Sequence, residues 1–115
     1  MRYLLLCCFE EKSWGQLTDS QCDGIMHEYG ELMQGLARSG QHLGSARLKP
    51  ASTAATVRAR NGKPTVIDGP FAETKEQLGG YHLLECKDLD EAISIAKRIP
   101  TIPYGGTVEV RALLT

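Results

Sequence analysis

Apolar and polar positions along the chain divide it into short strands and two longer amphipathic segments. The apolar run over residues 3–8 predicts a central strand that is buried on both faces. Residues 43–48 and 81–86 predict two further strands, and residues 107–113 alternate apolar and polar side chains as a half-buried strand does. These strands are expected to form one sheet.

Two helices are predicted between the strands. Residues 18–21, Thr-Asp-Ser-Gln, match a capping box, and apolar side chains then recur every three or four residues until Gly40. The apolar stripe of this first helix is expected to comprise Cys22, Ile25, Met26, Tyr29, Leu32, Met33 and Leu36. A second helix is capped by Asp88 and ends before Pro100. Its inward face is predicted to consist of Leu89, Ala92, Ile93, Ala96 and Ile99.

A β-hairpin is predicted around Asn61-Gly62, because this pair readily adopts the two positive φ values of a type I′ turn. Pro64 lacks an amide donor and therefore places the returning arm at a sheet edge. With the hairpin set aside, the order is strand, helix, strand, strand, helix, strand, which is the ferredoxin-like split βαβ arrangement. We therefore expect one α+β domain over residues 1–115, with an antiparallel sheet and an inserted β-hairpin.

Two helices can cover only one face of such a sheet. The other face receives Leu, Tyr and Cys side chains from the first and penultimate strands, and it is too apolar to remain in water. A homodimer that packs this face against a partner sheet is the expected solution.

Composition and charge narrow the class of protein. The chain of 115 residues has 13 basic and 14 acidic residues mixed along its length, which argues against direct binding of nucleic acid. No apolar run approaches the roughly 18 residues that cross a membrane. The four cysteines show no CxxC or Cys/His ligand spacing, so we expect reduced, inert thiols in a cytoplasmic protein.

Candidate site residues gather before the penultimate strand. Asp68 precedes Gly69-Pro70, where its carboxylate serves either as a turn cap or as a pocket group that acts as general base or ligand anchor. Glu73 and Lys75 follow in a charged stretch that is either a solvated loop or part of a substrate-binding segment. The Gly79-Gly80 pair allows the close approach of another backbone or of a ligand.

Further candidates lie on the strands. His82 alternates with Tyr81, so one of the two is expected to face the interior between the sheets, where a histidine acts as acid or base near neutral pH. Arg58 and Arg111 are candidates for binding an anionic substrate if both reach the interior, and an inter-subunit ion pair with Glu109 is the alternative. The sequence shows no metal-ligand cluster, nucleotide-binding loop or nucleophile elbow, so operation without a metal or cofactor is expected.

The stretch from Asp68-Gly69-Pro70-Phe71 to Gly79-Gly80-Tyr81 resembles the signature of the DGPF proteins of the YCII-related family, and the resemblance extends over nearly the whole chain. It implies a dimeric α+β barrel with a pocket between sheet and partner, and it favours Asp68 as a pocket residue. Shorter members of that family are thought to use a His on the first helix with an Asp near the last strand. Here Tyr29 stands at the His position, with core packing and pocket lining both open, and residues 99–104 hold no carboxylate. The dyad therefore does not transfer.

Two functions fit these features. The first is an enzyme-like protein that binds a small polar molecule and performs acid–base chemistry of lyase type, with Asp68 and His82 as catalytic residues. Its substrate-binding residues would be Tyr29, Arg58, Glu73, Lys75 and Arg111. The second is a non-catalytic ligand-binding or accessory module, linked to the extracytoplasmic-function sigma factors beside which, as the resemblance implies, DGPF-type domains often occur. A closed polar cavity with a shifted carboxylate favours the enzyme, and a shallow apolar groove favours the module.

Overall fold

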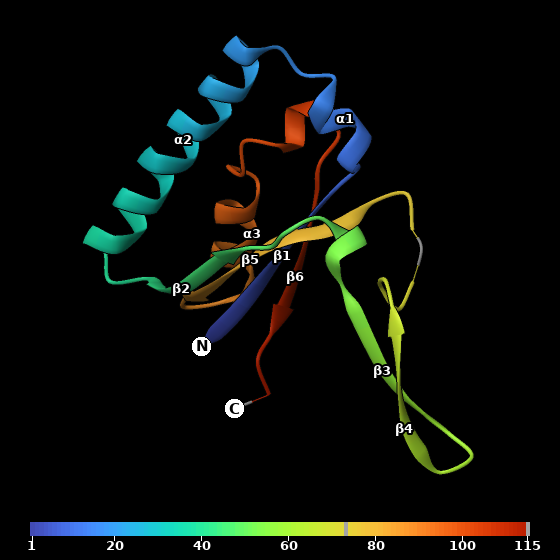
Figure 1. Cartoon of the computed structure of the whole chain (residues 1–115). Coiled ribbons are helices and arrows are strands. Elements are labelled where there is room, and N and C mark those ends of the chain that lie inside the picture. The colour runs from blue at the N-terminus through green and yellow to red at the C-terminus, as the bar shows by residue number, and fades with distance from the viewer. Residues whose placement is uncertain (73, 115) are drawn as a thin grey trace.

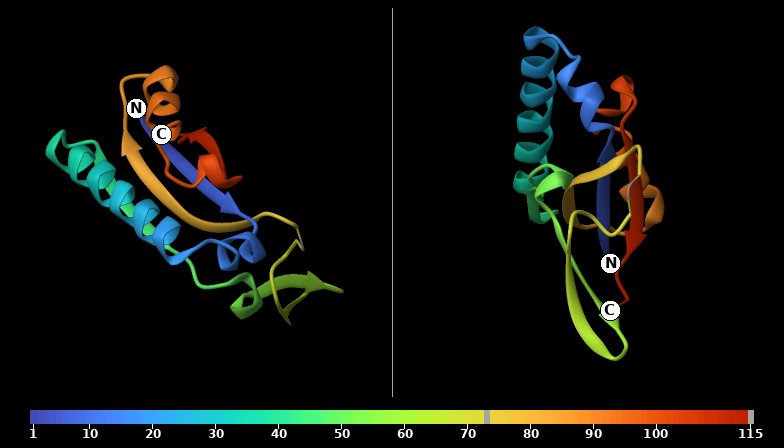
Figure 2. Two further views of the ribbon diagram at one scale, coloured as in Figure 1. Left: turned by 90° about the horizontal axis from the view of Figure 1, so that it is seen from above. Right: turned by 45° about the vertical axis from the view of Figure 1, so that its right-hand side comes forward.

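The structure is a computed structural model that describes residues 1–72 and 74–114. Its main sheet is antiparallel throughout, with strand order β2-β5-β1-β6 (Figure 1). The strands are β1 (Arg2–Phe9), β2 (His42–Arg47), β5 (Gln77–Glu85) and β6 (Thr107–Ala112). The helices α2 (Asp19–Arg38) and α3 (Leu89–Ala96) pack on one face of this sheet (Figure 2). The predicted ferredoxin-like α+β arrangement is confirmed.

Local sequence signals set the helix ends as expected. The Gln21 amide donates to the Thr18 hydroxyl at 3.1 Å, and the Thr18 amide donates to the Gln21 side chain at 2.9 Å, which completes the capping box. Gly40, with a φ of 75°, follows α2 in the left-handed conformation. The Glu91 amide donates to the Asp88 carboxylate at 2.9 Å and so caps α3.

Three shorter helical segments were not predicted: α1 (Glu11–Gly15), η1 (Ala51–Thr53) and η2 (Ile102–Tyr104). Each has five residues or fewer, too few for an apolar period to be recognised. None of the helices in the described part of the chain is long and apolar enough to cross a membrane.

The hydrophobic core lies between the sheet and the two helices. Its buried members are Tyr3, Leu5, Leu32, Leu36, Leu84, Cys86, Ala92, Ile95, Ala96 and Ile99. The prediction that the side chain faces the core was wrong for two residues, because Met26 is 46% exposed and Leu89 is 48% exposed. Leu89 is the first residue of α3 and lies in an exposed stretch, residues 87–90. On α2 the stripe is narrower than predicted, because the helix faces the core through buried positions 25, 32 and 36.

The second face of the main sheet, away from the helices, is hereafter the open face. In the register of β1 and β5, Leu5 lies opposite His82 and Leu6 opposite Tyr81. Leu5 is wholly buried beneath the helices, so the alternation of side chains directs Leu6 and Tyr81 to the open face. The open-face residues of the two central strands are Leu4, Leu6, Cys8, Leu78, Tyr81 and Leu83. This face is apolar, as the sequence predicted.

The inserted hairpin forms a separate two-stranded sheet of β3 (Ala55–Arg60) and β4 (Lys63–Asp68), hereafter the arm (residues 55–68). Asn61 and Gly62 have φ values of 51° and 76°, the positive pair that a type I′ turn requires. Pro64 lies on β4, which pairs with β3 alone, so its predicted place at a sheet edge is confirmed. The arm projects away from α2 and α3 (Figure 1, Figure 2).

Truncation of Leu84, which is wholly buried, should cost far more stability than truncation of exposed Leu89. Leu84→Ala leaves a cavity in the core and should lower the free energy of unfolding by about 2–5 kcal/mol. Leu89→Ala is the matched control and should change it by about 0.5 kcal/mol or less. Urea denaturation followed by circular dichroism measures both, and equal losses would contradict the assignment of the core.

Candidate functional site

Two of the predicted site residues, Tyr29 and His82, meet between α2 and the main sheet. Tyr29 projects from α2 towards the core, and His82 lies on the helix-covered face of β5 opposite Leu5. Their ring centroids are 5.9 Å apart, with an angle of 37° between the planes. Of the alternating pair on β5 it is therefore Tyr81 that faces the side where a partner sheet would lie, and His82 faces the helices.

His82 has a buried polar atom without a partner. Its Nδ1 is fully covered and makes no hydrogen bond within the part of the chain that the structure describes. Burial lowers the pKa of His82, and the nearby His42 lowers this pKa further. The imidazole is therefore neutral at neutral pH, with one nitrogen as donor and the other as acceptor. A buried nitrogen without a partner costs free energy, which the packing around His82 must offset.

The Tyr29 hydroxyl belongs to a small polar group with Cys7 and Thr101. Burial raises the pKa of Tyr29 to about 12, the Cys7 thiol adds to this rise, and an interaction with Thr101 opposes it. Burial also raises the pKa of Cys7 to about 11, against an opposing interaction with Tyr29. Both groups therefore keep their protons at neutral pH. The phenol is a proton donor, and the thiol is a poor nucleophile.

A tight turn holds Thr101 in this group. The Thr101 carbonyl accepts hydrogen bonds from the amides of Tyr104 and Gly106 at 3.0 and 2.9 Å. A Cβ on Gly106 would lie 2.7 Å from the Thr101 side-chain oxygen, so only glycine fits there without movement. The turn thereby fixes the position of the buried Thr101 side chain beside Tyr29.

A cation and an aromatic surface next to the pair were missed by the sequence analysis. The Arg47 guanidinium lies 5.7 Å from the centroid of the Trp14 ring. Trp14, on α1, meets Phe9 edge-on with ring centroids 6.1 Å apart. The charge of Arg47 opposes the rise in the pKa of Tyr29, which is the electrostatic effect of a cation near the hydroxyl. The only sequence signal was that residue 47 falls in a predicted strand, which does not tell which face it occupies.

The Gly79-Gly80 pair has a role within the chain itself. A Cβ on Gly80 would lie 2.8 Å from the Ala46 carbonyl oxygen, so glycine lets β2 approach β5 closely beside Arg47. Cys7 pairs with Gly80 and Cys8 with Leu78, which leaves Gly79 as a bulge in β5. The close backbone that the sequence suggested for this pair is that of a neighbouring strand.

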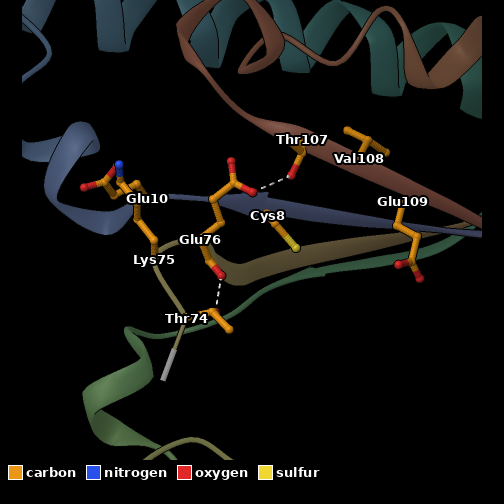
Figure 3. Close-up of a pocket in the computed structure, with 8 residues that line it drawn as sticks. All are labelled: Cys8, Glu10, Thr74, Lys75, Glu76, Thr107, Val108 and Glu109. Carbon is orange, nitrogen blue, oxygen red and sulfur yellow. Dashed lines mark hydrogen bonds and ion pairs between the residues drawn. The ribbon is translucent and has the colours of Figure 1, made fainter. Parts of the chain in front are cut away.

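A separate cavity of about 860 Å³, hereafter the acidic cavity, lies at the end of the open face (Figure 3). It is lined by Cys8, Glu10, Thr74, Lys75, Glu76, Thr107, Val108 and Glu109. The Lys75 ammonium is 3.9 Å from the Glu10 carboxylate, and the Thr107 hydroxyl donates to Glu76 at 3.4 Å. We place the candidate chemistry at Tyr29 and His82 instead, because both side chains are half-buried and His82 Nδ1 is fully covered, whereas Glu76 and Glu109 are exposed to solvent.

The remaining predicted residues lie on other parts of the molecule. Arg58 and Asp68 belong to the arm, and the Arg58 guanidinium lies 5.7 Å from the centroid of the Phe71 ring. Arg111 forms an ion pair with Glu109 on the open-face side of β6. Glu73 lies outside the described residues.

Backbone groups fix the turn after Asp68. The Gly69 amide donates to the Ala54 carbonyl at 2.7 Å, and the Thr56 hydroxyl donates to the Gly69 carbonyl at 2.7 Å. Gly69 has a φ of 101°, which disfavours any other residue there. In the described part of the chain no group of three or more His, Cys, Asp or Glu side chains is placed to hold a metal ion.

Comparison with known proteins finds relatives that match the chain over nearly their whole length. It is similar to an uncharacterized protein of Rhizobium meliloti, with 37% identity over 114 residues that cover 98% of this chain and 92% of the relative. Its fold is similar to that of 5-chloro-2-hydroxyhydroquinone dehydrochlorinase from Burkholderia phenoliruptrix, solved in complex with 2,5-dihydroxybenzoquinone. That likeness has a TM-score of 0.56 at 15% identity and covers 98% of this chain and 93% of the other. A family model described as the YCII-related domain matches residues 1–115, and the chain therefore belongs to the YCII-related family.

Proposed function

We propose that this protein binds a small polar molecule against Tyr29 and His82 and performs acid–base chemistry of lyase type on it, without a cofactor. The observation that supports this most is the buried Nδ1 of His82, which has no hydrogen-bond partner among the described residues. Nearly all buried polar atoms in proteins have a partner, so this exception beside the Tyr29 ring supports a functional role for His82 over one in packing alone.

The protonation states of the two rings suit complementary roles. His82 is neutral because burial lowers its pKa, and one of its nitrogens can accept a proton. Tyr29 stays protonated because burial raises its pKa to about 12, so its hydroxyl donates to a substrate oxygen. A base and a hydrogen-bond donor beside one another are what proton abstraction next to a carbonyl or phenol oxygen requires.

The surroundings of the pair suggest the substrate class. Arg47 supplies a positive charge for an acidic hydroxyl or a carboxylate, and Trp14 supplies a flat apolar surface. A planar, hydroxylated, anionic molecule matches both. The fold neighbour was solved with a hydroxylated quinone, and its name describes elimination of chloride, which supports the choice of probe.

The other predicted site residues have a secondary place in this proposal. Lys75 and Arg111 lie on the open-face side, and Arg58 and Asp68 lie on the arm. They would contribute to binding only through a second copy of the chain. Mutation of Asp68 and mutation of His82 can therefore test separately whether each is a catalytic residue.

We also propose a homodimer that packs the open faces of two copies together. Leu78 and Tyr81 on this face are 42% and 36% exposed in the single chain. Apolar burial contributes about 25 cal/mol per Å², so covering the face is strongly favourable. The four cysteines are free thiols, which suits the cytoplasm we propose as its location. Direct binding to nucleic acid is not part of the proposed function, given a net charge of -1.

Titration of the purified protein with 2,5-dihydroxybenzoquinone tests the proposed site. Tyr29→Phe and His82→Gln should each weaken binding by about tenfold, the cost of about one charge-assisted hydrogen bond. Asp68→Asn is the matched control, with an expected affinity and melting temperature close to those of the original chain. Mass spectrometry of the protein as purified would show whether it retains a molecule of this class.

Loss of binding in Asp68→Asn with intact binding in His82→Gln would move the site to the arm and overturn the assignment. Tight binding with no conversion of any bound molecule would favour the non-catalytic ligand-binding module.

The stability of the protein should depend on pH through His82. Because the pKa of His82 is lowered on folding, the unfolded chain binds its proton more readily than the folded chain. The stabilisation is thus present above the ordinary histidine pKa of about 6.5 and is lost as the pH falls through the folded-state value. Urea denaturation from about pH 7.5 to about pH 5 should show a larger loss for the original chain than for His82→Gln. If the free energy of unfolding fell by the same amount in both chains as the pH was lowered, His82 would not be desolvated in the folded protein.

The proposed dimer is tested by sedimentation at micromolar concentration. The original chain should sediment as a dimer, and Tyr81→Lys, which puts a charge in the middle of the open face, should shift it towards monomer. Leu89→Lys, on the exposed start of α3, is the control and should leave the dimer unchanged. A stable monomer of the original chain would contradict the proposal.

A further inference from the structure

The arm exposes an apolar surface that it does not cover itself. Val57 and Val66 form a cross-strand pair and are 65% and 66% exposed. Ala55, Ala59 and Pro64 lie on the same side of the arm by the alternation along its strands. An isolated two-stranded hairpin is marginally stable in water, so this surface is expected to gain a partner.

The end of the arm is basic. Over residues 55–68 the charged side chains are Arg58, Arg60, Lys63 and Asp68, and the three basic ones lie at or near the turn. Arg60 and Lys63 pair with one another across the turn in the strand register, and neither forms an ion pair in the described part of the chain. By the alternation along the strands, Arg60 and Lys63 lie on the side of the arm opposite to Val57 and Val66, so the arm is apolar on one side and basic on the other near its tip.

The acidic cavity on the open-face side has the opposite charge. Glu10, Glu76 and Glu109 line it against a single cation, Lys75. Lys75 lies near Glu10, and Arg111, outside the lining, pairs with Glu109. Glu76 has only the Thr107 hydroxyl as a side-chain partner among the described residues. Figure 3 shows these carboxylates around Cys8 on the central strand β1. The exposed leucine and tyrosine side chains of β5 continue from this cavity across the open face.

The arm and the cavity lie at the same end of the main sheet. The connection from the arm to β5 lines the cavity through Thr74, Lys75 and Glu76. The arm itself points away from the helices and out past the sheet (Figure 1, Figure 2). In a dimer whose two-fold axis runs parallel to the strands, like ends of the two sheets meet, and the arm of one copy comes beside the cavity of the other.

We infer that the arm of each copy docks on the open-face side of a second copy of the chain, with Arg60 and Lys63, on its basic side near the tip, in the acidic cavity. The inference rests on the proposed homodimer. Opposite charges on the two surfaces favour this partner over an unrelated protein.

Charge reversal on each side of the contact tests the inference. Arg60→Glu with Lys63→Glu should weaken the dimer by about tenfold in sedimentation equilibrium at low salt. Glu76→Lys with Glu109→Lys should weaken it similarly, and the chain that holds all four changes should recover most of the original affinity. Lys97→Glu with Arg98→Glu, on exposed positions at the end of α3, is the matched control and should have no effect.

Zero-length carbodiimide cross-linking of a mixture of ¹⁴N- and ¹⁵N-labelled original chains gives a second measurement that needs no variant. Cross-links between Lys63 of one isotope and Glu10, Glu76 or Glu109 of the other are expected. Suppose that the original chain dimerises, that charge reversal on the arm leaves the dimer affinity unchanged, and that no such mixed cross-link forms. This result would overturn the docking of the arm but not the homodimer. An original chain that is monomeric would overturn both.

Discussion

The antiparallel pairing of β1 with β5 is the constraint on which the rest of the molecule depends. These are the two central strands, and their register decides which side chains meet the helices and which stay on the open face. A shift of one residue in either strand would exchange the two sets. The buried Leu5 and Leu84 hold the register, because each would become exposed on the open face after such a shift. His82 lies opposite Leu5 in the same layer and is half-buried by the same packing.

This register separates two kinds of surface on the main sheet. One face of the sheet, under α2 and α3, contains Tyr29, His82 and the polar group with Cys7 and Thr101. The other face is apolar in the middle and acidic at one end. The proposed ligand chemistry and the proposed self-association therefore involve opposite sides of the same strands. A substitution on one side can change one property and leave the other intact.

Much of the fold was predictable because its signals are local. The capping box at Thr18, the cap at Asp88 and the Asn61-Gly62 turn depend only on residues within a few positions of each other. The site was predictable only in part. The period of α2 placed Tyr29 on the inward stripe, but alternation alone left open whether Tyr81 or His82 faced the helices. That choice depends on long-range pairing with Leu5.

Other parts of the site depend on contacts that the sequence does not record. Arg47 meets Trp14 through a helix of only five residues that has no recognisable period. The role of Gly80 depends on how closely β2 approaches, and that distance is a property of the assembled sheet. Conversely, the motif around Asp68 drew attention to a segment that the fold places on a projecting arm. A dense local motif shows that the local structure of a segment matters, but the position of that segment relative to the site depends on the tertiary structure.

The unpartnered nitrogen of His82 has a cost that the rest of the core must offset. Leaving a buried polar atom without a hydrogen bond costs about 1–3 kcal/mol, a sizeable share of the stability of a small domain. An apolar side chain of similar volume opposite Leu5 would remove that cost, yet the ring beside it is a tyrosine whose hydroxyl is also directed into a polar group. Two adjacent polar groups in an otherwise apolar layer are poor choices for packing alone. In the proposed function this cost has a purpose, because it holds a neutral base beside a protonated phenol, an arrangement that packing alone does not require.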